Sequence, residues 1–215
     1  MIAWRLYWLI LLAAAVVWAV WFVYRAELPT KAVAVVAVVG LLPVMYLGYA
    51  EFSWQRNEAR YTKAVRPIAA AAVVRCQRFT EALLDLDNYS GHVVYTADGR
   101  IETVAHLDRD VCNDLARVPR QASAATVDHV AALHVLVHEA EHVAGVIPEA
   151  EADCYAIQHT PATAVRVGFS EEAGRAYAVR YLQEVYPRMS ETYRNTTACA
   201  PGGEWDLQLP GFRWS

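Results

Sequence analysis

The chain has 215 residues, a formal net charge of −4 and an apolar fraction of 56%. This length is typical of one domain with a sizeable core, with or without an appendage. The negative charge, together with the lack of a basic stripe interleaved with aromatic residues, argues against a nucleic-acid-binding protein. The apolar residues gather near the N-terminus, so the chain divides into two regions of different composition.

Two uncharged runs of nineteen residues lie near the N-terminus, at residues 6–24 and 32–50. At about 1.5 Å per residue, each run can cross a hydrocarbon core of roughly 30 Å. They predict a transmembrane helical hairpin within residues 1–52, embedded in a lipid bilayer, and a soluble domain in residues 53–215. Two alternatives stay open. The first run could be a cleaved signal peptide, and the second could be a buried core helix that contains Gly40 and Pro43.

The side of the membrane on which the soluble domain lies is indicated in two opposite ways. More basic residues flank the two ends of the hairpin than lie in its linker. The ends carry Arg5, Arg56, Arg60, Lys63 and Arg66, and the linker carries Arg25 and Lys31. This bias favours a cytoplasmic domain. An even number of cysteines beyond the apolar runs favours disulfides in an oxidising compartment instead. The possible disulfide cysteines are Cys76, Cys112, Cys154 and Cys199.

Beyond the apolar runs, the sequence predicts a mainly α-helical domain with one small β-hairpin. Residues 51–86 are expected to be helical with a break at Pro67, and residues 91–104 to form a hairpin around Asp98 and Gly99. Further helices are expected at residues 108–118, 123–145 and 170–188. Gly145 and Pro148 mark the end of one helix and the start of another.

The segment from His138 to His142 fits the pattern H-E-x-x-H. On a helix, two histidines four residues apart point from one face and can bind one ion, with Glu139 close to a water on that ion. A catalytic zinc site needs a third ligand. Glu149 is the candidate if the helix ends before it, because an uninterrupted helix would separate it from His138 by about 16 Å. Asp153 shares a face with Glu149 and can accept the free N–H of a ligand histidine.

This stretch resembles the zinc metallopeptidases of the gluzincin arrangement, in which H-E-x-x-H is followed by E-x-x-A-D. It is also similar to small, uncharacterised, membrane-anchored bacterial proteins with the pattern H-E-x-x-H-x-x-G-x-x-x-E. The resemblance implies a zincin-like helical domain in a bacterial cell membrane, with one zinc ion as cofactor. It implies His138, His142 and Glu149 as metal ligands, Glu139 as general base and Asp153 as the acid that supports a ligand histidine.

We therefore expect a membrane-anchored, zinc-dependent metallopeptidase that hydrolyses peptide bonds with zinc-activated water. Possible donors to the oxyanion are His159, Tyr177 and Tyr181, among which spacing does not choose. His134 is expected only to line the helix. One alternative is a non-catalytic zinc-binding or interaction protein that keeps a zincin-like scaffold. Another is a buried hydrogen-bonded network without metal. The link to the third ligand is shorter than in gluzincins, and Pro148 stands where metzincins carry theirs.

Overall fold

The computed structural model describes residues 2–26, 29–78, 90–96, 98 and 100–214. The chain forms two compact units, Met1–Arg56 and Asn57–Ser215. The described residues are mainly helical, with a small three-stranded sheet in the second unit and two long apolar helices at the N-terminus.

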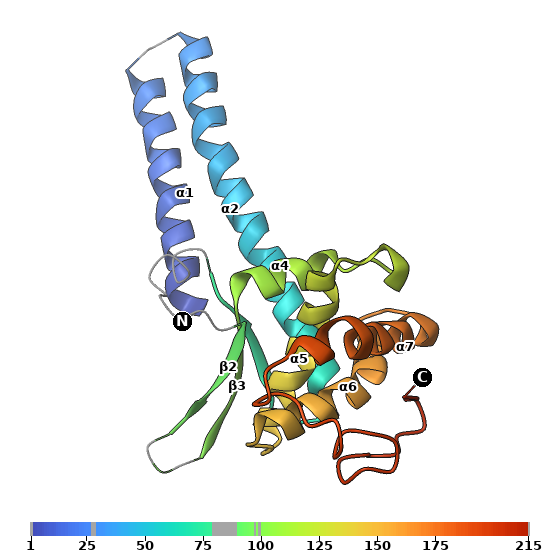
Figure 1. The fold of residues 1–215 in the computed structure, drawn as a ribbon. Coiled ribbons are helices and arrows are strands. Elements are labelled where there is room, and N and C mark those ends of the chain that lie inside the picture. Colours follow the sequence, from blue (N-terminus) through green and yellow to red (C-terminus); the bar gives the residue numbers. More distant parts are fainter. Residues whose placement is uncertain (1, 27–28, 79–89, 97, 99, 215) are drawn as a thin grey trace. The chain divides into compact units, whose positions relative to one another are not determined.

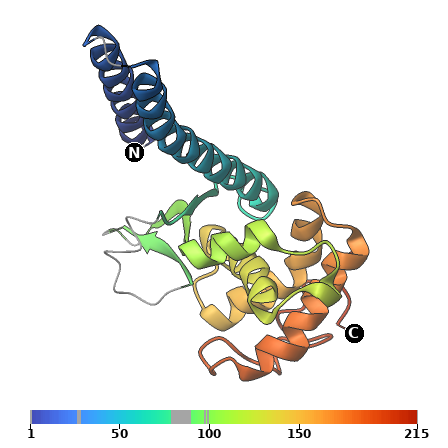
Figure 2. The same ribbon diagram turned by 90° about the horizontal axis from the view of Figure 1, so that it is seen from above.

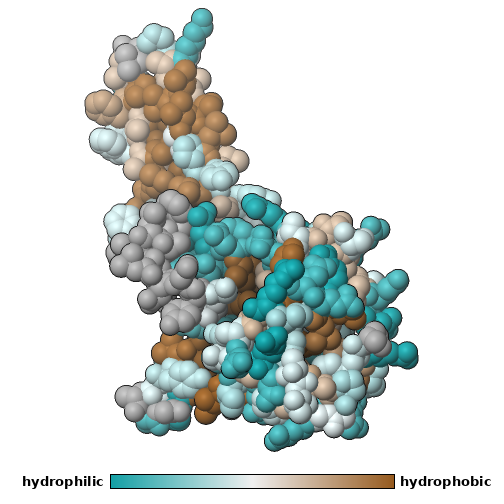
Figure 3. Space-filling model, viewed as in Figure 1, coloured by the Kyte–Doolittle hydropathy of each residue, from teal (hydrophilic) through white to brown (hydrophobic). Residues whose placement is uncertain are grey.

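The first unit is a hairpin formed by α1 (Ile2–Arg25) and the part of α2 (Thr30–Val65) up to Arg56, which run side by side (Figure 1). Both are long and apolar enough to cross a membrane. Their large apolar side chains are exposed, as for Val39 at 66% and Met45 at 68%, and aliphatic residues colour much of this unit brown in Figure 3. The helices approach closely at Gly40, where an added Cβ would lie 2.7 Å from a methyl group of Val16. The prediction of two apolar helices is confirmed.

The C-terminal turns of α2 belong to the second unit, where Glu58, Tyr61, Ala64 and Val65 are buried. Glu58 accepts a hydrogen bond from the Cys76 amide over 2.9 Å and pairs with Arg78 over 2.6 Å. The buried carboxylate therefore ties the end of the helix to the segment that follows it.

The prediction that a helix resumes after Pro67 is wrong for residues 66–78. The helix ends at Val65, and residues Val73–Cys76 form strand β1. Two β-branched residues, Val73 and Val74, favour an extended backbone, and the Val74 amide donates to the hydroxyl of Thr62 over 2.9 Å. Residues 79–86 of the predicted helix lie outside the described residues.

The sheet contains β1, β2 (Gly91–Tyr95) and β3 (Ile101–Leu107) in the order β1-β3-β2. Strand β2 runs antiparallel to β3, with Gly91 opposite Leu107, so the predicted hairpin is confirmed. Its turn residues 97 and 99 lie outside the described residues. The sequence did not reveal that β1 adds a parallel strand, with Val73 opposite Val104. Among the described strands, β2 forms a sheet edge.

The helices of the second unit surround α5 (Val127–Val143), which lies against the sheet, α4 (Arg109–Arg117) and α6 (Glu149–Arg166) (Figure 2). Thr126 caps α5 by accepting from the His129 amide. Leu133, Leu136 and Val137 of α5 are fully buried, and each stabilises the fold by about 1.5–3 kcal/mol. These contacts hold the polar face of α5 in a fixed position.

The chain after α6 is less regular than the single helix predicted for residues 170–188. It forms α7 (Glu171–Arg180), a π-helical turn η2 (Tyr181–Val185) and a 3₁₀ turn η3 (Tyr186–Arg188). A further 3₁₀ turn, η1 (Ala122–Ala124), precedes α5. Pro187 lies within η3 and has no N–H to donate, which limits the helical turns that follow α7.

All four cysteines are paired, in two disulfides. Cys76–Cys112 joins β1 to α4, and Cys154–Cys199 joins α6 to the C-terminal segment. Gln158, buried in α6, also holds this segment: it donates to the Trp205 carbonyl and accepts from the Leu207 amide, each over 2.8 Å. The disulfides predicted from the cysteine count are present, with a connectivity that the sequence left open.

Candidate metal centre

A row of histidines one helical turn apart, His134, His138 and His142, lies on a buried face of α5. All three rings are buried, with relative exposures of 2%, 7% and 4%. Burying a polar ring costs free energy unless it finds partners. The partners come from the turn after α5 and from the first turns of α6.

The turn is built by Gly145, whose φ of 104° suits glycine far better than other residues. Its amide donates to the His142 carbonyl over 2.9 Å, and the Val146 amide donates to the Glu141 carbonyl over 3.1 Å. These two bonds form a Schellman motif, which ends the helix as the sequence predicted. Pro148 is the N-cap of α6, and Glu149 is its first residue. The chain therefore reverses and brings Glu149 back to the histidines.

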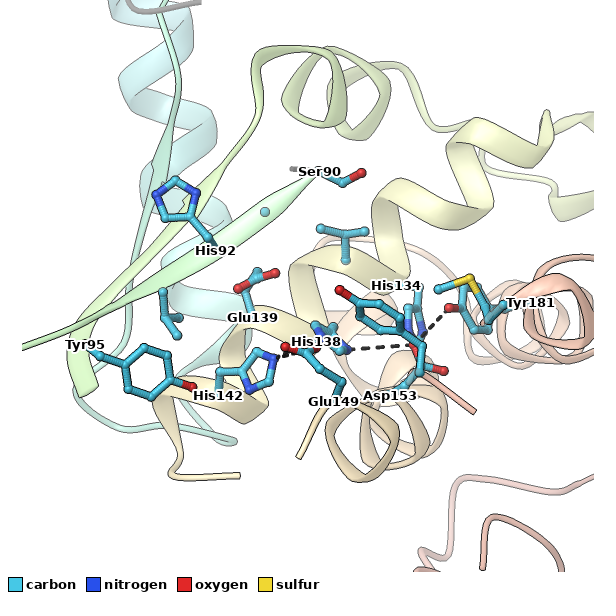
Figure 4. Close-up of a pocket in the computed structure, with 15 residues that line it drawn as sticks. Ser90, His92, Tyr95, His134, His138, Glu139, His142, Glu149, Asp153 and Tyr181 are labelled. Atoms are coloured by element: carbon cyan, nitrogen blue, oxygen red, sulfur yellow. Dashed lines mark hydrogen bonds and ion pairs between the residues drawn. The ribbon is translucent and has the colours of Figure 1, made fainter. Parts of the chain in front are cut away.

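Three side-chain atoms converge where the two helices meet (Figure 4). His138 Nε2 lies 3.0 Å from Glu149 Oε2 and 3.0 Å from His142 Nε2, and His142 Nε2 lies 3.2 Å from Glu149 Oε2. Ligand atoms about 2.0 Å from a tetrahedral ion lie about 3.3 Å apart. The three atoms are therefore spaced almost as three ligands of one ion. His142 is oriented by its Nδ1, which lies 2.7 Å from the Val146 carbonyl.

A second group, His134, His138 and Asp153, could also hold an ion by proximity alone. Its spacing differs, because His134 Nε2 lies 2.7 Å from Asp153 Oδ1 and the Tyr181 hydroxyl donates to the same oxygen over 3.0 Å. Asp153 Oδ1 thus already accepts two hydrogen bonds, and it lies 3.8 Å from His138 Nδ1. The donor set of His138, His142 and Glu149 fits an ion better.

Several buried polar atoms at this site have no hydrogen-bond partner among the described residues. They are His134 Nδ1, His138 Nδ1, Glu139 Oε2 and Asp153 Oδ2. Such atoms are rare in folded proteins and call for a missing partner, such as water or an ion. Two imidazoles and a carboxylate, which suit zinc and other transition metals, complete the fit of these residues to a metal ion.

The electrostatics favour metal-binding forms of two candidate ligands. Burial lowers the pKa of His138 in spite of its hydrogen bond to Glu149, and the neighbouring histidines lower it further. Its ring is therefore neutral near pH 7, the charge state in which an imidazole nitrogen binds a metal. The hydrogen bond from His138 lowers the pKa of Glu149 against the opposing effect of burial, so this group is a carboxylate. At His138 the effect of burial on the pKa is larger than that of the hydrogen bond. The Glu149 side chain is 37% exposed, so its hydrogen-bonded partners determine the direction of its pKa shift.

Glu139 lies next to this group in a different electrostatic state. It is 4% exposed, and burial followed by the charge of Glu149 raises its pKa to about 8. Strand β2 packs closely on the Glu139 side chain, because a Cβ added at Gly91 would lie 2.7 Å from Glu139 Oε1. A cation nearby would lower this pKa and give a carboxylate able to accept a proton.

The convergent atoms open into a pocket of about 300 Å³. One wall is strand β2, with Gly91, Val93 and Tyr95, and Met189 and Tyr193 contribute from the segment after α7. The Tyr95 hydroxyl points towards the histidines in Figure 4. The pKa of Tyr95 is raised by partial burial and by the charges of Glu149 and Glu139, so the hydroxyl keeps its proton. The pocket thus joins the candidate ligands, a buried acid and a phenol.

The predicted oxyanion donors lie in three different places. His159 Nδ1 is 2.6 Å from Glu141 Oε1, and the Tyr177 hydroxyl donates to the Pro119 carbonyl over 2.6 Å. Neither residue lines the pocket. Tyr181 does line it, but its hydroxyl donates to Asp153.

Sequence reasoning missed Tyr95, Tyr193 and Gly91 as pocket residues. It also treated His134 as a bystander, although its ring contacts Asp153. The available signal for Tyr95 was alternation along a strand, which says which side chains share a face but not what that face meets. The signal for His134 was its spacing of four from His138.

The chain matches no protein-family model, no curated protein and no solved structure. The interpretation of the site therefore depends on its own geometry.

Proposed function

We propose that this protein is a membrane-anchored, zinc-dependent hydrolase of peptide bonds, similar in its site to gluzincin metallopeptidases. One observation carries the proposal: three donor atoms meet with separations of 3.0–3.2 Å, beside a buried glutamate, in a pocket open to solvent. A purely structural zinc site is closed by four protein ligands, whereas a catalytic site leaves a position open. Three candidate ligands in an open pocket favour catalysis.

His138, His142 and Glu149 would hold the ion, which supplies Lewis acidity to acidify water and polarise a carbonyl oxygen. Glu139 accepts the proton of the attacking water and delivers it to the amine nitrogen that leaves as the peptide bond breaks. Its position beside the ligands and its lack of a partner at Oε2 suit this exchange. Burial raises the pKa of Glu139 and a bound cation would lower it, so the group would be ionised and able to accept the proton when the ion is present.

Tyr95 is the residue that we propose as hydrogen-bond donor to the oxyanion that develops on the carbonyl oxygen. Its hydroxyl faces the pocket, and none of His159, Tyr177 and Tyr181 has a hydroxyl or ring nitrogen directed there without a protein partner. Tyr95→Phe should lower kcat by roughly 10²-fold, the usual cost of removing one such donor. It should leave the bound metal unchanged.

The substrate is proposed to bind as an extended segment along β2. This strand pairs only with β3 among the described residues, and Gly91, Val93 and Tyr95 line the pocket. An extended peptide can add to such an edge through backbone hydrogen bonds. The edge would then present a peptide bond to the ion and to Glu139.

The apolar helices α1 and α2 are proposed to anchor the protein in a membrane, with the second unit in an oxidising compartment. The two disulfides support this side, because disulfides persist where glutathione does not keep thiols reduced. The charge bias of the flanking arginines and lysines points to the opposite side. Labelling of thiols in intact cells before and after reduction tests the assignment.

The first experiment is metal analysis by mass spectrometry on the full chain purified in detergent. The proposal predicts one zinc per chain, lost in His142→Ala and in Glu149→Ala. His129→Ala is the matched control, because His129 lies on the same helix and its side chain bonds to Thr126 of the helix cap among the described residues. Absence of zinc in the folded wild-type chain would contradict the proposal.

The second experiment separates catalysis from metal binding. Glu139→Gln should abolish cleavage of a peptide library while the zinc content stays the same. Zinc without turnover in the wild-type chain on any library would favour the alternative, a non-catalytic zinc-binding or interaction protein with the same scaffold.

A further inference from the structure

Behind the proposed ligand His138 lies a buried group of three side chains, His134, Asp153 and Tyr181. They come from α5, α6 and the π-helical turn η2, and their relative exposures are 2%, 1% and 3%. His134 Nε2 lies 2.7 Å from Asp153 Oδ1, and the Tyr181 hydroxyl donates to the same oxygen over 3.0 Å (Figure 4). The rings of His134 and Tyr181 also stack, with centroids 3.5 Å apart and planes 14° apart.

The hydrogen bonding fixes the roles of these groups. A carboxylate only accepts, so His134 Nε2 carries the proton in its bond to Asp153. Burial and the neighbouring Asp153 raise the pKa of Tyr181, so its hydroxyl is also a donor. Two donors from different elements therefore hold one carboxylate oxygen. A residue on α6 alone would be free to change rotamer, whereas Asp153 is held from two sides.

Asp153 faces His138, the central residue of the proposed metal site. His138 Nδ1 lies 3.8 Å from Asp153 Oδ1 and has no hydrogen-bond partner among the described residues. The other nitrogen, Nε2, faces Glu149 and His142. To ligate through Nε2, the neutral ring must carry its proton on Nδ1, and a carboxylate at that side favours this tautomer.

We infer that His134 and Tyr181 are positioning residues: together they aim the Asp153 carboxylate at Nδ1 of His138 and so fix the tautomer with which His138 binds the ion. The inference rests on the proposed metal site and deepens it. It gives His134, the histidine of the row that is not a proposed ligand, a role in positioning. Its 2.7 Å hydrogen bond to Asp153 disfavours a role as a ligand. The inference also gives a role to the π-helical turn that carries Tyr181, since π-helical turns are frequent at functional sites.

The test compares metal affinity among variants of the full chain in detergent, with Co²⁺ as the probe and a chelator as competitor. Tyr181→Phe keeps the ring stack and loses the donor, and His134→Phe does the same at the other position. Each should weaken Co²⁺ binding by about tenfold or more, as loss of such supporting residues does in other metal sites. His134→Gln retains an N–H donor and should recover part of the loss.

Tyr177→Phe is the matched control, because Tyr177 is also a buried tyrosine and its hydroxyl donates to the Pro119 carbonyl outside the pocket. It should bind Co²⁺ within about twofold of the wild-type chain even if the fold is less stable. The visible spectrum of bound Co²⁺ should change in Tyr181→Phe and His134→Phe and stay the same in Tyr177→Phe. A merely structural role would not alter the spectrum.

The outcomes separate the two ideas. Wild-type affinity and spectrum in both Tyr181→Phe and His134→Phe would overturn the positioning role and leave the metal site standing. An equal loss in Tyr177→Phe would overturn it as well, because the effect would then follow stability. A folded wild-type chain that binds no Co²⁺ would overturn the metal site and the positioning role together.

Discussion

Glu139 should contribute strongly to the pH dependence of the stability of the metal-free protein. Burial and the charge of Glu149 raise its pKa from 4.5 to about 8 in the folded state. A carboxyl whose folded pKa lies above its unfolded pKa stabilises the fold fully below pH 4.5. That contribution is lost as the pH rises towards 8, because the unfolded chain releases the proton more readily.

The size of this effect follows from the two pKa values. At about 1.36 kcal/mol per pKa unit, the loss relative to pH 4.5 or below is about 2 kcal/mol at pH 6 and on the order of 4 kcal/mol at pH 8. Glutamine at position 139 has the same shape and does not titrate. The free energy of unfolding of Glu139→Gln should therefore equal that of the wild-type chain at pH 4.5 and exceed it by several kcal/mol at pH 8.

The assay is urea unfolding of both chains in detergent with a chelator present, followed by pulse proteolysis between pH 4.5 and 8.5. The difference between the two free energies of unfolding isolates Glu139, because all other groups titrate alike in both chains. Adding zinc should reduce the difference, since a cation stabilises the ionised carboxylate. A difference that stays constant over this pH range would refute the reasoning.

Three further predictions concern the frame of the site. The double variant Cys154→Ala/Cys199→Ala should lower the free energy of unfolding by about 4 kcal/mol in the same urea assay, because the disulfide spans 45 residues; an unchanged urea midpoint would contradict this. Gly145→Ala should lower the free energy of unfolding by about 1 kcal/mol or more, because the φ of 104° at this position is unfavourable for alanine. The melting temperature of the variant should fall accordingly. Gly91→Ala should displace the Glu139 side chain and lower peptide cleavage at least tenfold. Its zinc content should stay at the wild-type value.

Local signals predicted much of the fold and the candidate site. The apolar runs predicted the two N-terminal helices, and Gly145 predicted the end of α5. Both features depend only on short stretches of chain. The meeting of His138 with Glu149 was also predictable, since only a turn separates their helices. The separation of the three donor atoms required the structure.

Long-range pairing explains what sequence reasoning missed. The strand at Val73 was predicted as helix because its parallel partner, Val104, lies 31 positions later, and no local pattern reveals such a pairing. Tyr95 and Tyr193 reach the pocket from segments on either side of α5, so their spacing from His138 carried no signal. Tyr181 illustrates the same limit, because its hydroxyl meets an aspartate 28 residues earlier in the chain.

The closeness of the proposed ligands along the chain has a consequence for biosynthesis. His138 and Glu149 are 11 positions apart, so a short loop closure assembles all three donors. The segment that carries Tyr193 and Cys199 is synthesised later, and at about 5–20 residues per second it follows within seconds. If the proposed site binds an ion, the α5–α6 hairpin would present all three donors early, and binding would tighten once Tyr181 is in place to hold Asp153. The segment that carries Tyr193 and Cys199 would then complete the pocket wall and the second disulfide.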